Sequence, residues 1–399
     1  MALIEETVVE PDEARVEALV DQLLADCPPD TTPERDFLGR QFDLGLAWIQ
    51  FPEGHGGLGL SPKLNRTVLQ RIARAGGPIG GSRNPIGYGM CGPAVEVHGT
   101  DEQRALLRPL FTNEHIWCQL FSEPGAGSDV ASLAMRAERD GDEWIINGQK
   151  VWTTLAHFAR YGLLIARSDP DQPKHRGITA FIVDMEAPGV EVKPLRQMTG
   201  EAEFNEVFFT DVRIPDSMRL DEPGRGWGVS ITTLMNERVS IGGGTPPRNS
   251  GPIGQLLDVY ASTGPHDAAV RDEMATLWVE AEVNRLTNMR AASTRKSGTP
   301  GPEGSVGKLA MAELNKRIYS FAVDLMGADG MLYTSFAMHQ PKTALFTDDM
   351  HKNFLRARAN SIEGGTSEVL RNILGERVLG LPGDVRVDKE LPWSQVPRS

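Results

Sequence analysis

Two segments near the middle of the chain contain the residue types expected at a site for a flat, polar ligand. The first, residues 121–130, reads FSEPGAGSDV and combines two glycines, a proline and small hydroxyl residues. Such residues let the backbone approach a ligand closely. The second, residues 147–154, reads NGQKVWTT and adds a tryptophan ring for stacking and threonine hydroxyls for hydrogen bonds. Together the two segments predict a flavin site.

Both segments resemble the flavin-contact segments of the acyl-CoA dehydrogenase family, and the resemblance extends from about Leu38 to about Gly383. It implies FAD as the cofactor, and it assigns cofactor contacts to Ser122, Gly127, Ser128, Trp152, Thr154, Thr366 and Glu368. Ser128 is also assigned to the substrate. Considered singly, Trp152 would be a core aromatic and Thr154 a strand residue. For Thr366, which precedes an expected helix, a plain helix cap is the alternative.

The resemblance implies that the protein oxidises an acyl-CoA thioester to its α,β-enoyl form. This oxidation needs a base for the α-proton, an acceptor for the β-hydride and hydrogen-bond donors to the thioester carbonyl. An ordinary side chain cannot accept a hydride, so a flavin must do so. The base is best a carboxylate whose pKa is raised by a dry site.

Two carboxylates are candidates for this base. Glu237 lies in the sequence LMNERV, on an expected helix between two glycine clusters, and family members with a base on this helix carry Glu directly before Arg. Other members carry the base in a C-terminal Tyr-Glu-Gly-Thr segment, to which residues 362–366 (IEGGT) are similar, with Gly364 at the position of the base. Glycine cannot abstract a proton, which favours Glu237. The neighbouring Glu363 stays an alternative, and either residue could instead be a solvated glutamate with a structural partner.

Two arginines also have predicted roles. Arg238 follows the candidate base and is expected to orient the substrate or the helix, with a surface ion pair as the alternative. The family commonly carries an Arg-x-x-Phe-Gly segment that reaches the dinucleotide phosphates of a neighbouring subunit, whereas residues 246–254 here read PPRNSGPIG. Arg248 is the candidate substitute. The broken motif leaves open a homo-oligomer, dimer or tetramer, and a hetero-oligomer with a related subunit, as in actinobacterial two-chain relatives.

The bulk composition limits the classes of partner. The chain has 399 residues, 40% of them hydrophobic and 24% charged, and a net charge of −13. This charge argues against nucleic acid or an anionic membrane as a partner, because both favour clusters of Lys and Arg.

The three cysteines lack the spacing of a disulfide framework or zinc site, and no metal is expected at His55, His115 or His157. The N-terminus lacks the pattern of a signal peptide, so we expect a cytoplasmic protein.

Three domains are expected, because the pattern of residue types changes twice along the chain. Residues 1–116 carry helix-start signals, residues 117–223 alternate β-branched and aromatic residues with turn dipeptides, and residues 224–399 return to helical periodicity. The expected fold class is therefore α+β, with an N-terminal helical domain, a central β-barrel-like domain and a C-terminal four-helix bundle. The order of these domains is the one found in the family that the chain resembles.

Four local features of the sequence add detail to the predicted fold. Thr100–Gln103 reads as a capping box at a helix start. Asp140-Gly141 and Asn147-Gly148 suit hairpin turns, because their residues tolerate positive φ. The tail after Pro382 contains further prolines and is expected to be extended or loosely held.

The resemblance therefore implies an FAD-dependent acyl-CoA dehydrogenase that passes electrons to electron-transferring flavoprotein. A base on the Glu237 helix accompanies branched, long or bulky acyl groups in relatives, so acyl groups of that kind, sterol side chains included, are predicted substrates. Two alternatives stay open. One is an acyl-CoA oxidase-like flavoenzyme, in which oxygen reaches the reduced flavin, and the other is a non-catalytic or co-catalytic subunit of a two-chain acyl-CoA dehydrogenase.

Overall fold

The computed structural model describes residues 11–81, 83–242, 245–294, 304–341, 349–383, 385 and 388–397, without the side chains of residues 238–242 and 294. The chain divides into two compact units. The first contains the residues up to Cys118 together with Ala159–Tyr161, and the second contains the remainder.

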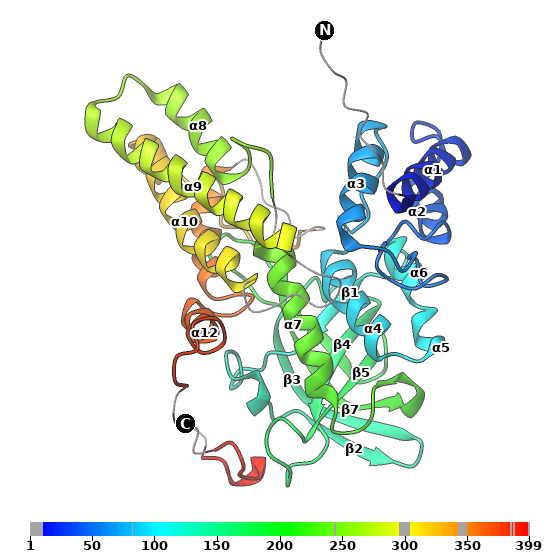
Figure 1. Ribbon diagram of the computed structural model, residues 1–399. Coiled ribbons are helices and arrows are strands. Elements are labelled where there is room, and N and C mark those ends of the chain that lie inside the picture. The colour runs from blue at the N-terminus through cyan, green and yellow to red at the C-terminus, as the bar shows by residue number, and fades with distance from the viewer. Residues whose placement is uncertain are drawn as a thin grey trace. The chain divides into compact units, whose positions relative to one another are not determined.

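The first unit is helical (Figure 1). Its helices are α1 (Pro11–Asp26), α2 (Glu34–Asp43), α3 (Asn65–Arg74), α4 (Gly92–His98), α5 (Asp101–Arg104) and α6 (Leu107–Phe111). One core cluster joins apolar residues of the first three helices and the segment between them, including Val16, Val20, Phe37, Ile49, Val68 and Ile72. The predicted capping box is confirmed, because the Thr100 hydroxyl accepts the Gln103 backbone N–H and the Gln103 side chain accepts the Thr100 N–H.

An eight-stranded mixed sheet forms the middle of the chain. Its strands are β1 (Trp117–Leu120), β2 (Arg136–Asp140), β3 (Glu143–Thr154), β4 (Tyr161–Arg167), β5 (Ile178–Asp184), β6 (Val190–Pro194), β7 (Phe204–Pro215) and β8 (Arg219–Leu220). The strand order is β6-β7-β3-β2-β4-β5-β8, and β1 pairs with β4. The long strands β3 and β7 pair antiparallel over most of their length. The end of β3 therefore has a well-defined position in the sheet.

One of the two predicted hairpin turns is wrong. Asp140-Gly141 does join β2 to β3, and Gly141 has a positive φ of 67°. Asn147-Gly148, in contrast, lies inside β3, where the register against β7 shifts between Ile146 and Gly148. A Cβ on Gly148 would lie 3.0 Å from Met135, so this glycine permits a β-bulge with a close backbone approach rather than a turn.

The C-terminal part of the second unit is helical. It contains α7 (Gly226–Gly242), α8 (Pro252–Thr263), α9 (Ala268–Thr294), α10 (Gly304–Leu325), α11 (Met350–Arg356) and α12 (Ser367–Ile373). Helix α10 contacts each of the other five, and Figure 1 shows α8, α9 and α10 side by side. The predicted α+β fold class, with helical, β and helical domains in that order, is confirmed. In the part of the chain that the structure describes, no helix has the length and apolar character needed to cross a membrane.

Helix α7 begins against the sheet. A Cβ built on Gly226 would lie 2.7 Å from the Thr179 carbonyl carbon on β5, so only a glycine allows the helix to start this close to the strand. The hydroxyls of Ser230 and Thr233 are buried and donate to backbone carbonyls one turn earlier in the same helix. These contacts fix the first two turns of the helix that carries Glu237.

Candidate active site

The two predicted flavin-contact segments lie side by side in the structure. The Val151 N–H donates to the Ser122 carbonyl oxygen at 2.9 Å. Two backbone hydrogen bonds between Glu123 and Ala126, of 3.1 and 3.0 Å, close a tight turn in the first segment. A Cβ built on the second glycine of this segment, Gly127, would meet nothing within 4 Å. The turn therefore presents backbone to open space, as the site for a flat ligand requires.

A buried ion pair holds the first segment onto β3. The Lys150 Nζ lies 2.8 Å from Glu123 Oε1 and donates to the Phe121 carbonyl oxygen at 2.9 Å. The Lys150 side chain is 0% exposed. Glu123 also accepts the backbone N–H groups of Ala134 and Met135, at 2.7 and 3.0 Å. The carboxylate is thus bonded on both oxygens, and the pair fixes the turn in one position.

Trp152 has an unusual backbone and an exposed ring. Its φ is +59°, and it lies where the register of β3 against β7 shifts between Lys150 and Thr153. A left-handed conformation costs a non-glycine residue about 1–2 kcal/mol. The side chain is nevertheless 58% exposed, with its ring packed edge-on against Phe204 at 5.8 Å between centroids. Strain that leaves a large aromatic ring exposed favours a role in ligand stacking.

Thr154, Ser128 and Ser122 are the hydroxyl residues of the two flavin-contact segments that are predicted to contact the cofactor. Thr154 is half-buried and pairs with Phe204 at the end of β3. Ser128 is exposed, and Ser122 is half-buried with its carbonyl turned to β3. An open glycine turn, an exposed indole and accessible hydroxyls fit the ring and ribityl chain of a flavin.

Glu237 lies close to the start of the first segment. It is half-buried on α7, and the Gln119 side-chain nitrogen lies 3.5 Å from its Oε2. Gln119 is on β1, two residues before Phe121. The contact is long for a hydrogen bond. Arg238 is part of α7, but its side chain lies outside the described residues.

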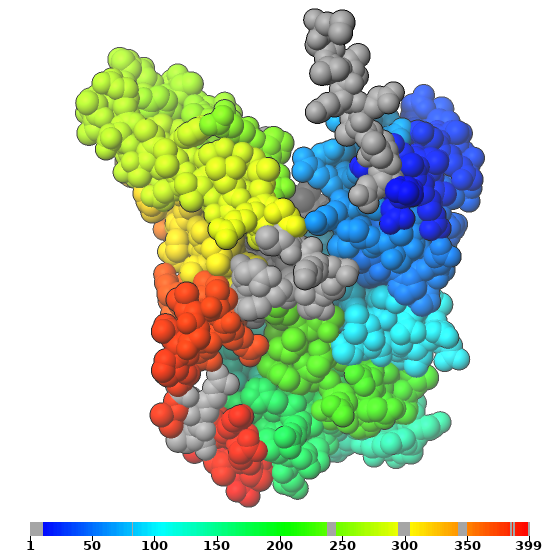
Figure 2. All heavy atoms as spheres, in the orientation of Figure 1, coloured from blue at the N-terminus to red at the C-terminus, as the bar shows by residue number. Residues whose placement is uncertain are grey.

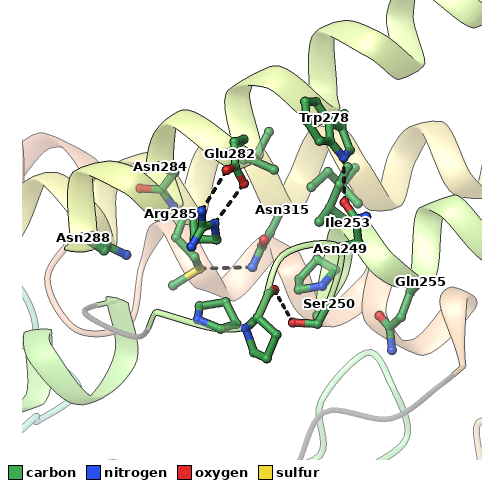
Figure 3. A pocket seen from close by; sticks show the side chains of 18 of the residues that line it. Asn249, Ser250, Ile253, Gln255, Trp278, Glu282, Asn284, Arg285, Asn288 and Asn315 are labelled. Carbon is green, nitrogen blue, oxygen red and sulfur yellow. Dashed lines mark hydrogen bonds and ion pairs between the residues drawn. The ribbon is translucent and has the colours of Figure 1, made fainter. Parts of the chain in front are cut away.

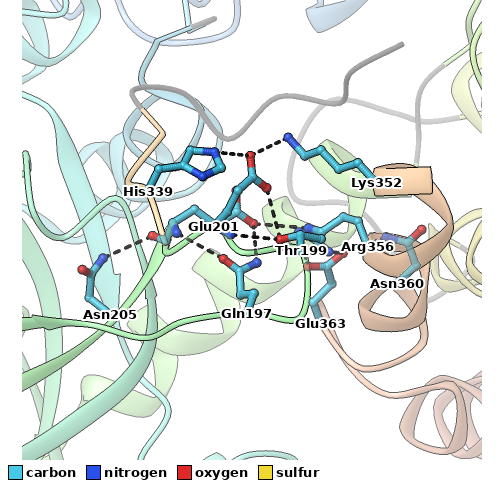
Figure 4. Close-up of polar contacts among 10 residues, drawn as sticks. Gln197, Thr199, Glu201, Asn205, His339, Lys352, Arg356, Asn360 and Glu363 are labelled. Atoms are coloured by element: carbon cyan, nitrogen blue, oxygen red, sulfur yellow. Dashed lines mark hydrogen bonds and ion pairs between the residues drawn. The ribbon is translucent and has the colours of Figure 1, made fainter. Parts of the chain in front are cut away.

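Glu363, the other candidate base, is bound by several donors (Figure 4). Arg356 forms a bidentate pair with its two oxygens, at 3.1 and 2.8 Å, and the Asn360 amide donates to Oε1 at 2.8 Å. The same guanidinium donates through Nε to Glu203 at 3.2 Å. Such a bidentate pair is geometrically specific. A proton transferred to Glu363 would weaken these charge-assisted bonds, which favour the ionised carboxylate.

The cluster in Figure 4 continues from Glu363 into the middle domain. Glu201 is buried and pairs with Lys352, while the imidazole of His339 lies 3.6 Å from it. Glu203 is also buried, and this burial raises the pKa of its carboxyl. The cluster ties residues 197–205 to the C-terminal helical region.

Phe204 places this cluster next to the flavin-contact segments. Its ring lies 5.8 Å from the Trp152 ring and 5.6 Å from the Arg356 guanidinium carbon. The structure therefore brings Trp152 and the loop that carries Glu363 into one neighbourhood. Neither Phe204 nor Arg356 belongs to a recognisable sequence motif, so the sequence does not predict their place here.

A buried lysine holds the glycine loop before α12. Lys308 donates to the carbonyl oxygens of Asn360 and Gly365, at 2.8 and 2.6 Å. The Thr366 hydroxyl caps α12 by accepting a backbone N–H at 3.2 Å, so the helix-cap alternative is observed for this residue. Glu368 is exposed in the first turn of α12. Contacts of these two residues with a dinucleotide stay predictions.

A pocket of about 300 Å³ lies among α8, α9, α10 and residues 246–252 (Figure 3). Its walls combine Trp278 and Tyr319 with polar side chains such as Asn315. None of the predicted site residues is among the described residues that line it. Arg248 lies over the Trp278 ring at 4.8 Å and 3.7 Å from Glu282, so its guanidinium is engaged within its own chain. A contact of Arg248 with a neighbouring subunit's phosphates stays a prediction.

Three family models match the chain. The acyl-CoA dehydrogenase N-terminal domain matches residues 8–114, the middle domain matches residues 118–212 and the C-terminal domain matches residues 224–379. The matched segments follow one another in the order of the domains described above.

Similar proteins carry the same family name. Acyl-CoA dehydrogenase FadE34 of Mycobacterium tuberculosis is 38% identical over 342 residues, which cover 85% of this chain but only 45% of FadE34. Acyl-CoA dehydrogenase IpdE1 of the same organism is 35% identical over 347 residues, or 86% of each chain. This chain therefore corresponds to nearly the whole of IpdE1 and to less than half of FadE34.

Two solved structures have a similar fold. The Tcur3481-Tcur3483 steroid ACAD superimposes with a TM-score of 0.71 at 26% identity, over 96% of this chain and 100% of that chain. The ChsE4-ChsE5 complex from Mycobacterium tuberculosis gives a TM-score of 0.70 at 27% identity, over 94% and 98% of the two chains.

Proposed function

Since the chain belongs to the acyl-CoA dehydrogenase family of FAD-dependent oxidoreductases, we propose that it converts a bulky acyl-CoA thioester to the trans-2-enoyl thioester with Glu237 as base. In this proposal FAD is bound by the residues already predicted for it, namely Ser122, Gly127, Ser128, Trp152, Thr154, Thr366 and Glu368. Ser128 and Arg238 contact the substrate.

One contrast supports Glu237 over the alternative. Its carboxylate lies beside Gln119, next to the flavin-contact segment, and that contact is long at 3.5 Å. Glu363 accepts three shorter bonds from Arg356 and Asn360. A general base must be able to reach the proton that it removes. Glu237 meets this condition through its place beside the flavin-contact segment, whereas Glu363 is held by Arg356 and Asn360.

The proposed chemistry divides between the cofactor and the chain. When bound, FAD supplies the hydride acceptor that no side chain provides. A carboxylate oxygen of Glu237 takes the α-proton, the electron pair of that C–H bond forms the α,β double bond, and the β-hydrogen leaves as hydride. Trp152 would stack on the flat ring of the bound cofactor and keep water from it, and the glycine turn would allow close backbone approach.

The relatives support a proposal for the substrate class and for the assembly. One similar structure is a steroid ACAD, and we extend that substrate class to this chain as a sterol side-chain or other bulky, branched acyl-CoA. Another is a complex of two named chains, which supports a hetero-oligomer with a related subunit beside the homo-oligomer. Electron-transferring flavoprotein is the proposed electron acceptor.

The test is an anaerobic titration of the purified, FAD-loaded protein with a panel of acyl-CoA thioesters. The panel contains a short straight chain, a long straight chain, a branched chain and a sterol side chain, and the loss of the oxidised flavin absorbance band is followed. We expect the bulky members to bleach the flavin at the lowest concentrations. If no member bleaches it, the proposed activity is wrong.

Two further observations in the same experiment separate the rival functions. Rapid reoxidation of the bleached protein in air would favour an oxidase-like enzyme over a dehydrogenase. A colourless protein that takes up no FAD, alone or with a related subunit, would favour a non-catalytic subunit.

A further inference from the structure

The C-terminal tail, residues 388–397, lies against the middle domain, where Figure 2 shows it in red beside the green of that domain. From its sequence this tail is expected to be extended or loosely held. We propose instead that it acts as a clamp, which holds the end of the flavin-contact segment in the conformation that binds FAD. This inference rests on the proposed assignment of residues 121–130 to the cofactor.

The first part of the clamp is a buried arginine covered by a tryptophan. Arg167 is 3% exposed, and its Nη2 donates to the carbonyl oxygens of Ala131 and Leu133, at 2.6 and 3.3 Å. The Trp393 ring lies 4.9 Å from the guanidinium carbon, and its Nε1 donates to the Ser132 carbonyl oxygen at 3.2 Å. Three successive carbonyls directly after the flavin-contact segment are therefore bound by one guanidinium and one indole.

The second part is a lysine between two aspartates. The Lys174 Nζ lies 2.8 Å from Asp129 and 2.7 Å from Asp388, and the lysine side chain is only 12% exposed. Asp129 is the residue after Ser128, and it also accepts the Ser132 hydroxyl at 2.6 Å. Lys174 thus ties the tail directly to the segment that contains the predicted cofactor contacts.

Backbone hydrogen bonds hold the tail in place. The Trp393 N–H donates to the Gln172 carbonyl and the Ser394 N–H to the Pro170 carbonyl, each at 2.9 Å. These bonds fix the tail to the turn that carries Lys174. The indole can reach Ser132 only while this docking persists, so opening the tail removes Trp393 from Arg167 and Asp388 from Lys174.

The charges of the clamp are suited to a wide pH range. Burial opposes a charged Lys174, but its bonds to Asp129 and Asp388 outweigh burial and raise the pKa of the lysine. The bond to Lys174 in turn lowers the pKa of Asp388. The aspartate contribution is lost only as the pH falls below its ordinary pKa of about 3.9, and the lysine contribution only as the pH rises above about 10.4. Lys174 and Asp388 therefore stay charged throughout the physiological range.

The experiment measures FAD affinity and tail protection in the full-length protein. The apoprotein of the parent, of Trp393→Ala and of Lys174→Met is titrated with FAD, and the melting temperature of each apoprotein is recorded. We expect each variant to raise the FAD dissociation constant roughly tenfold, because each loses a cation–π contact or a pair of charged hydrogen bonds. Ser394→Ala is the matched control, since this hydroxyl contacts Asp171 and not the flavin-contact segment.

A conservative variant and a reciprocal measurement distinguish a clamp from a merely stabilising tail. Lys174→Arg keeps both charge pairs and is expected to restore most of the affinity. Coupling between two sites is reciprocal. If opening the tail weakens FAD binding, saturating FAD should therefore slow carboxypeptidase digestion of the parent's tail. The ratio of the digestion rates without and with FAD should be similar to the ratio of the FAD dissociation constants with the tail open and closed.

Three results would decide the outcome. Unchanged FAD affinity in Trp393→Ala and Lys174→Met, with equal digestion of the apo and FAD-bound parent, overturns the clamp and leaves the proposed function standing. A parent protein that takes up no FAD overturns both. A parent that binds FAD and shows the coupling, but is not bleached by any acyl-CoA, supports the clamp and contradicts the proposed function alone.

Discussion

The ion pair between Glu123 and Lys150 should be the most sensitive structural element of the proposed flavin site. The change that tests it is Lys150→Met, which keeps the length and apolar character of the side chain but removes its charge. The variant loses the bonds to Glu123 and to the Phe121 carbonyl, at 2.8 and 2.9 Å. It leaves a carboxylate that is 8% exposed without its cation.

The magnitude follows from the burial of both partners. Breaking a buried pair by removing one partner costs about 3–5 kcal/mol, because the remaining charge is uncompensated. Glu123 keeps two backbone N–H donors from Ala134 and Met135, so we expect the lower end of this range for Lys150→Met. Glu123→Gln should cost a similar amount, because it leaves the fully buried ammonium unpaired.

The assay is guanidinium unfolding of the parent, the two single variants and the double variant, followed by intrinsic fluorescence. The double variant should be more stable than the sum of the single effects predicts, with a coupling energy of about 1–3 kcal/mol. Arg213→Met is the control in the same sheet, because Arg213 is 52% exposed and pairs with Glu143 at the surface. We expect no measurable change for it. Additive effects of Lys150→Met and Glu123→Gln would refute the reasoning.

Three further predictions concern other parts of the site. Trp152→Gly should raise the melting temperature of the apoprotein, since glycine tolerates the φ of +59°, and should weaken FAD binding, which a fluorescence titration measures. Burial raises the pKa of Glu203, so its contribution to stability is present below about pH 4.3 and is lost as the pH rises through the folded pKa. The melting temperature of Glu203→Gln should therefore increase relative to that of the parent as the pH rises. A difference in melting temperature that does not change with pH would contradict the raised pKa of Glu203. Lys308→Met should increase hydrogen exchange in residues 360–366, because the buried ammonium no longer binds two carbonyls of this loop.

Much of the fold could be predicted from local patterns. The capping box at Thr100 and the turn at Asp140-Gly141 depend on the backbone conformations of a few neighbouring residues, so the local sequence predicts them. The motif pair at residues 121–130 and 147–154 also predicted segments that the structure brings together. In each case the signal lies in residues close in sequence.

Features that depend on tertiary contacts could not be predicted. Glu123 and Lys150 are 27 residues apart, and their sequence contexts do not reveal that they pair. Asn147-Gly148 has the composition of a hairpin turn, but β7 pairs on both sides of it and turns it into a bulge. The sequence predicts an extended or loosely held tail, because the prolines near Trp393 do not reveal that its indole packs on the buried Arg167.

The identity of the base also depends on tertiary structure. The sequence left Glu237 and Glu363 as alternatives, and it favoured Glu237 only because Gly364 occupies the other position. The bidentate pair between Arg356 and Glu363 adds a physical reason, since this carboxylate is already bound. Arg356 is separated from Glu363 by one helical turn and a loop, and no pattern in the sequence marks it.

The most direct test of the account is the rate at which a reactive acyl-CoA bleaches the flavin in an anaerobic stopped-flow experiment. Glu237→Gln, an isosteric change, should slow this step by about 10²–10⁴-fold, the usual contribution of a general base, while leaving the oxidised flavin spectrum intact. Glu363→Gln is the matched control and should bleach within about tenfold of the parental rate. If Glu237→Gln bleaches at the parental rate while Glu363→Gln does not, the assignment of the base is wrong.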